Sequence, residues 1–174
     1  MTRILACLGT LALTVFPAFA KVPVLPAACD AALSARHPDW KLYMPDDLNA
    51  PRYKGFSPRT IVSADLDSDG IADVAMLVMF QQQHPALGPT KGVMVFACLS
   101  SRKHELVEVG HTATGDSLFE LEAVDSARDN RLRDPPGNGR VRRWGLIWHH
   151  NSYACIDYWY EGRKFVEGKV YCPD

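Results

Sequence analysis

The 174-residue sequence has no excess of charge of either sign, because 19 lysine and arginine residues are matched by 20 aspartate and glutamate residues. A net charge of -1 argues against a protein that binds nucleic acid or anionic membranes through a broad basic surface. The hydrophobic fraction of 47% also argues against a disordered chain. Length and composition therefore predict one packed domain.

The usual sequence motifs of catalysis and zinc binding are absent. The chain has no Gly-x-Ser-x-Gly or His-Glu-x-x-His motif, no phosphate-binding glycine loop, and neither Cys-x-x-Cys nor His-x-x-x-His spacing. Gly115-Asp116-Ser117-Leu118 matches the letters of the GDSL hydrolase motif, but it lies in the middle of the chain and no Asp-x-x-His supplies a base. A GDSL-like hydrolase is therefore the least favoured alternative, and we expect a protein without catalytic residues.

Long hydrophobic runs are missing everywhere except at the N-terminus. A positively charged start, Met1-Thr2-Arg3, precedes an apolar run over residues 4–16 and the small-residue pattern Ala18-x-Ala20. This order is typical of a signal peptide cleaved after Ala20. We therefore expect residues 1–20 to be removed and residues 21–174 to form a single β-rich domain. That domain is expected to be periplasmic or secreted and not to insert into a membrane.

Cysteines are few. Cys7 falls within the predicted signal peptide, which leaves Cys29, Cys98, Cys155 and Cys172. An even number of cysteines in an exported chain favours disulfides, and four cysteines allow three connectivities. Cys155 and Cys172 flank the last predicted hairpin, so we favour a Cys155–Cys172 bridge. The remaining Cys29–Cys98 bridge would join the N-terminal helix to a sheet.

The hydrophobic pattern predicts a mainly β fold of the α+β type, with one antiparallel sheet structure built of hairpins and one short N-terminal helix. Apolar residues at helical spacing predict the helix over residues 26–36, before His37-Pro38. Strands are predicted over residues 59–64, 74–80, 92–99, 105–111, 117–123, 141–149, 153–160 and 165–171.

The densest run of acidic residues is Asp65-Leu66-Asp67-Ser68-Asp69-Gly70-Ile71-Ala72-Asp73, between two predicted strands. Carboxylates at its first, third and fifth positions can converge when the chain wraps around a cation, and Gly70 permits the sharp turn that follows. Hard oxygen donors of this kind favour Ca²⁺ over softer metals. The loop is not an EF-hand, which would need glutamate at the position of Met76 and a helix on each side.

This loop resembles the calcium loops of FG-GAP and VCBS repeats, in which Asp-x-Asp-x-Asp-Gly-x-x-Asp runs into an apolar strand. The resemblance covers about residues 61–80, and a single copy cannot form a propeller. It implies a structural calcium ion and a ligand set made of the side chains of Asp65, Asp67, Asp69 and Asp73 and the carbonyl of Ile71. The alternative is an acidic turn that binds no metal.

The C-terminal part carries a second resemblance. The aromatic hairpin Tyr158-Trp159-Tyr160-Glu161-Gly162-Arg163-Lys164-Phe165, the signal peptide and the β-rich plan are similar to periplasmic immunity proteins. Those proteins block peptidoglycan-cleaving amidases that are delivered by type VI secretion. The resemblance implies a non-enzymatic inhibitor with a protein partner. A cell-envelope accessory protein with no inhibitory role is the alternative.

Two polar segments are the candidate partner-binding surfaces. The small polar residues Gly115, Asp116 and Ser117 can enter a narrow catalytic cleft, where the Ser117 hydroxyl could bond to a histidine. Arginines crowd residues 128–143, which is typical of a solvated basic loop. The alternative is a docking surface, with Arg140 and Arg142 at the rim of the interface, where arginine is favoured.

Overall fold

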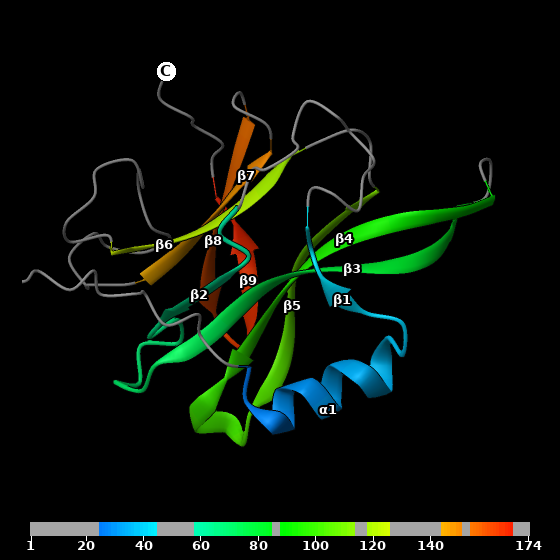
Figure 1. The fold of residues 1–174 in the computed structure, drawn as a ribbon. Coiled ribbons are helices and arrows are strands. Elements are labelled where there is room, and N and C mark those ends of the chain that lie inside the picture. The colour runs from blue at the N-terminus through cyan, green and yellow to red at the C-terminus, as the bar shows by residue number, and fades with distance from the viewer. Residues whose placement is uncertain are drawn as a thin grey trace, which may run out of the picture.

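The computed structural model in Figure 1 describes residues 25–44, 58–84, 88–113, 118–125, 144–150 and 154–168. Its elements are α1 (Ala27–Arg36), β1 (Lys41–Leu42), β2 (Ile61–Ala64), β3 (Asp73–His84), β4 (Gly88–Leu99), the 3₁₀ turn η3 (Ser100–Arg102), β5 (Glu105–Ala113), β6 (Phe119–Asp125), β7 (Trp144–His150), β8 (Ala154–Glu161) and β9 (Lys164–Glu167). No helix within these ranges is long and apolar enough to cross a membrane.

The strands form two antiparallel sheets. The first has the order β1-β3-β4-β5, with β2 also paired to β3, and the second has the order β6-β7-β8-β9. The mainly β fold with antiparallel hairpins and one short helix confirms the sequence prediction. The sequence pattern does not predict the division into two sheets, because the pattern of one strand does not show which other strands pair with it.

The main hydrophobic core lies between the two sheets. Tyr43, beside the first sheet, packs edge-on against Phe119 of β6 with ring centroids 5.4 Å apart. The Tyr43 hydroxyl also accepts a hydrogen bond from the Phe119 N–H at 3.2 Å. Leu121 N–H donates to the Arg59 carbonyl at 2.9 Å, so a main-chain hydrogen bond also joins the sheets. The two sheets therefore behave as one packed unit.

Helix α1 covers the other face of the first sheet (Figure 1). Its buried residues Cys29 and Leu33 pack with Met76, Phe96 and Cys98 of β3 and β4. Cys29 and Cys98 form a disulfide with a Cα–Cα distance of 6.0 Å, which confirms the predicted link between helix and sheet. Such a bridge compensates for the small contact area of a ten-residue helix.

The second predicted bridge falls partly outside the described residues. Cys155 is disulfide-bonded and lies on β8. Its predicted partner, Cys172, is not among the residues that the structure describes, so the Cys155–Cys172 pairing stays a prediction.

The second sheet buries a carboxyl group, that of Asp157 on β8. The residue is 7% exposed, and its Oδ1 has no hydrogen-bond partner among the described residues. Oδ2 accepts one hydrogen bond, from Trp159 Nε1 at 3.2 Å. Burial raises the pKa of Asp157 above its usual value of 3.8, and the Trp159 bond opposes this shift only in part.

We expect Asp157→Asn to become more stable relative to wild type as the pH rises from 4 to 7. Because the folded pKa is raised, the native state of the wild type binds more protons than the unfolded state above pH 3.8, so this carboxyl makes stability fall as the pH rises. The asparagine variant lacks that titration. Urea unfolding of both proteins at several pH values measures the difference. A difference that stays constant or shrinks with rising pH contradicts this assignment.

Candidate metal centre

The acidic loop joins two paired strands. β2 pairs with β3 from Ile61↔Met76 to Ala64↔Asp73, so residues 65–72 close this hairpin as the sequence predicts. The backbone enters the left-handed region twice, at Ser68 with φ 62° and at Gly70 with φ 89°. Glycine adopts that conformation without strain, which explains its place after the third aspartate.

Two aspartates of the loop hold its backbone in place. The Asp65 carboxylate accepts hydrogen bonds from Asp69 N–H at 2.9 Å and from Gly70 N–H at 3.0 Å. Asp69 Oδ1 accepts from Ile71 N–H at 2.7 Å. Hydrogen bonds from the Ser101 hydroxyl and from Ile71 N–H lower the pKa of Asp69, so this exposed carboxyl is charged. The carboxylates of Asp65 and Asp69 therefore hold the loop through its own backbone N–H groups, and Ser101 of η3 adds a contact to Asp69.

Asp73, which the sequence predicts as a metal ligand, also anchors the loop as a buried hydrogen-bond acceptor. The residue is 0% exposed, and its Oδ2 accepts from Leu66 N–H at 2.9 Å and from Asp67 N–H at 3.4 Å. Its Oδ1 accepts from Ser100 N–H at 2.8 Å, in the turn after β4. Burial raises the pKa of Asp73, while the N–H groups of Ser100 and Leu66 lower it. One carboxylate thus ties the β2–β3 loop to the neighbouring turn.

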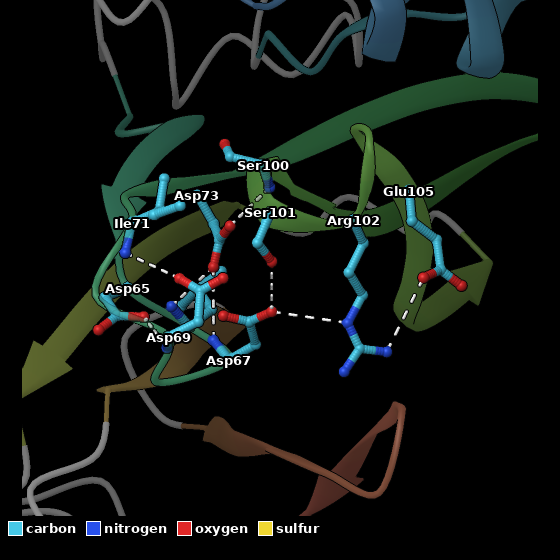
Figure 2. A network of polar contacts seen from close by, with 10 residues as sticks. Asp65, Asp67, Asp69, Ile71, Asp73, Ser100, Ser101, Arg102 and Glu105 are labelled. Carbon is cyan, nitrogen blue, oxygen red and sulfur yellow. Dashed lines mark hydrogen bonds and ion pairs between the residues drawn. The ribbon is translucent and has the colours of Figure 1, made fainter.

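Asp67 combines a buried side chain with one carboxylate oxygen that the described residues do not satisfy. Its side chain is 4% exposed and its Oδ2 accepts from the Ser101 hydroxyl at 3.1 Å. Arg102 Nε lies 3.6 Å from the same oxygen (Figure 2). The other oxygen, Oδ1, is buried and has no hydrogen-bond partner among the described residues. A buried carboxylate oxygen without a donor is unfavourable, and a cation at this point would remove that cost.

The carboxylates of Asp65, Asp67 and Asp73 converge. Each contributes an oxygen that lies within 4.8 Å of the other two. Calcium binds oxygens at about 2.3–2.6 Å, so two ligands of one ion lie at most about 5 Å apart. These three residues could therefore hold one metal ion. Asp69 lies beside them with Oδ1 bonded to Ile71 N–H, and the predicted ligand role of the Ile71 carbonyl stays a prediction.

The sequence does not point to three further residues that contact this group of carboxylates from the turn after β4. These residues belong to η3. Ser100 N–H donates to Asp73, the Ser101 hydroxyl donates to Asp67, and Arg102 pairs with Asp67. Val74 pairs with Cys98 in the β3–β4 ladder, and this register brings the end of β4 beside the start of β3. The sequence shows these residues only as a polar turn, so nothing local connects them with the acidic loop.

The predicted partner-binding residues are not part of this centre. Gly115, Asp116 and Ser117 lie outside the described residues, between the end of β5 and the start of β6. Arg140 and Arg142 also lie outside the described residues, before β7. Their roles therefore stay predictions.

No known protein family, curated protein or solved structure matches this chain.

Proposed function

We propose that this protein is an exported, non-enzymatic binding protein whose acidic loop holds a structural calcium ion. The observation that carries this proposal is the buried Oδ1 of Asp67, which lies within a group of three converging carboxylates and has no hydrogen-bond partner in the described part of the chain. The donors are all hard oxygens, which suit calcium. Asp65, Asp67 and Asp73 would hold the ion, with Asp69 adding negative charge beside them.

The expected role of the ion is to stabilise the fold. Three carboxylates whose oxygens lie within 4.8 Å repel one another, and a divalent cation reverses that repulsion. Asp73 and Asp67 also bond to Ser100 and Ser101, so an ion on these carboxylates would hold the β2–β3 loop against η3. An ion with this role needs no open coordination position for a substrate. The Cys29–Cys98 disulfide suits the oxidising environment outside the cytoplasm.

Calcium is expected to raise the melting temperature of metal-free protein. At a hundredfold excess over Kd, binding to the native state alone adds about 2.7 kcal/mol. For a domain of this size that gain corresponds to a shift of about 5–10 °C. The measurement compares thermal melts in chelator, in calcium, and in magnesium as a control for nonspecific ion effects. Coincident melts in chelator and calcium contradict the proposal.

A protein partner belongs to the same proposal but has a separate test. We propose that the partner is a peptidoglycan-cleaving effector that the segment around Ser117 inhibits, by analogy with the immunity proteins that the chain resembles. Cells producing the effector in the periplasm should grow when wild-type protein is present and grow less when Ser117→Trp replaces it. If the variant protects as well as wild type, this segment is not the inhibitory loop. If wild-type protein gives no protection either, the alternative is a cell-envelope accessory protein.

A further inference from the structure

Arg102 connects the acidic loop with the second sheet. It ends η3, and its guanidinium group lies 3.6 Å from Asp67 Oδ2 and 3.9 Å from a Glu105 oxygen (Figure 2). The same group lies over the ring of Tyr160 on β8, at 5.2 Å from the ring centroid. Tyr160 in turn packs edge-on against Phe165 of β9 at 5.2 Å. One side chain therefore contacts a proposed calcium ligand and an aromatic pair of the other sheet.

The Arg102 side chain is the cation that the structure places next to Asp67. Arg102 is 32% exposed, whereas the Asp67 side chain is 4% exposed, so the carboxylate is the more deeply buried partner. A buried carboxylate needs a compensating charge. In calcium-free protein the arginine supplies part of that charge, although at 3.6 Å it pairs with Asp67 without a short hydrogen bond.

We infer that Arg102 is a built-in competitor of calcium, and that the ion is coupled through this residue to the contact between the acidic loop and the second sheet. This inference rests on the proposed calcium site. A calcium ion on Asp67 repels the guanidinium group and also neutralises the carboxylate that attracts it. Arg102 therefore lowers the calcium affinity and stabilises the calcium-free protein. Because this coupling is reciprocal, calcium binding weakens the Arg102–Asp67 ion pair. The guanidinium group then keeps its contacts with Glu105 and Tyr160.

The test measures calcium affinity by calorimetric titration of full-length mature protein. Arg102→Gln removes the charge, Arg102→Lys keeps it, and Arg36→Gln is the matched control. Arg36 also lies over an aromatic ring, that of Phe96 at 5.9 Å, but on the face of the first sheet that α1 covers. Arg102→Gln should bind calcium about three- to tenfold more tightly than wild type. Arg102→Lys and Arg36→Gln should stay close to wild type.

A second readout is measured on the wild-type protein, so it does not depend on the folding of an Arg102 variant. The ring signals of Tyr160, assigned by NMR with the help of Tyr160→Phe, should shift when calcium is added, because Arg102 changes its position over the ring. The inference is wrong if wild type binds calcium but these signals do not move, or if Arg102→Gln binds no more tightly. Those outcomes leave the calcium site intact. Absence of calcium binding in all four proteins overturns both the site and the coupling.

Discussion

Replacing Asp73 by alanine is expected to lower the free energy of unfolding by about 4 kcal/mol. The carboxylate is fully buried and accepts hydrogen bonds from the N–H groups of Leu66, Asp67 and Ser100. Alanine leaves these three donors without their acceptor, and each unsatisfied buried donor costs about 1–3 kcal/mol. Urea unfolding in chelator measures this loss, and the chelator separates it from any loss of calcium.

Asp69→Ala is the matched control for this prediction. It also removes a carboxylate from the loop, but Asp69 is exposed, so water can replace it as the partner of Ile71 N–H and of the Ser101 hydroxyl. In chelator its unfolding midpoint should stay close to wild type. If Asp73→Ala also stays close to wild type in chelator, Asp73 is not the anchor that joins the loop to η3.

Removing the Cys29–Cys98 bridge by a double alanine substitution is expected to cost about 4 kcal/mol. The bridge closes a loop with a sequence separation of 69 residues, and the chain-entropy relation gives about 4 kcal/mol for a loop of that length. Since α1 has only ten residues, it depends strongly on this link to β4. For a domain of this size the melting temperature should fall by about 8–16 °C.

The control for the bridge is wild-type protein reduced under denaturing conditions and refolded in reductant. It lacks the same cross-link but keeps the sulfur atoms that pack in the core under α1. Because reduction also breaks the disulfide of Cys155, the comparison is with the double alanine variant refolded in the same reductant, and reduced wild type should be slightly more stable than that variant. If the double variant unfolds at the same urea concentration as oxidised wild type, the bridge does not stabilise the fold.

Much of the fold and part of the site could be predicted because the relevant signals are local. The apolar run at residues 92–99, the strand-like segment at residues 105–111 and the polar turn between them predict the β4–β5 hairpin, which the structure confirms. The spacing predicts that the first, third and fifth carboxylates of the loop, Asp65, Asp67 and Asp69, converge. In the structure the oxygens that lie within 4.8 Å of one another are those of Asp65, Asp67 and Asp73, so the prediction holds for the first two. Spacing within one loop determines these positions, so no knowledge of strand order is needed.

The rest depends on contacts between residues far apart in the sequence. Ser100 and Arg102 reach the acidic loop only because β3 and β4 pair in one particular register. The position of Arg102 over Tyr160 further depends on how the two sheets pack. Local hydrophobic patterns do not encode either feature. For the same reason, the spacing shows Asp73 as a ligand candidate but not as the acceptor of three main-chain bonds.

The most direct measurement of the central claim is calorimetric titration of metal-free wild-type protein with calcium, beside Asp67→Asn and Asp30→Asn. Asp30 is an exposed acidic residue in the first turn of α1 and is the matched control, since its substitution removes one negative charge outside the acidic loop. We predict one calcium ion per chain for wild type and Asp30→Asn, and binding at least about tenfold weaker for Asp67→Asn. No binding by wild type, or equal affinity in Asp67→Asn, would contradict the assignment of the acidic loop as a calcium site.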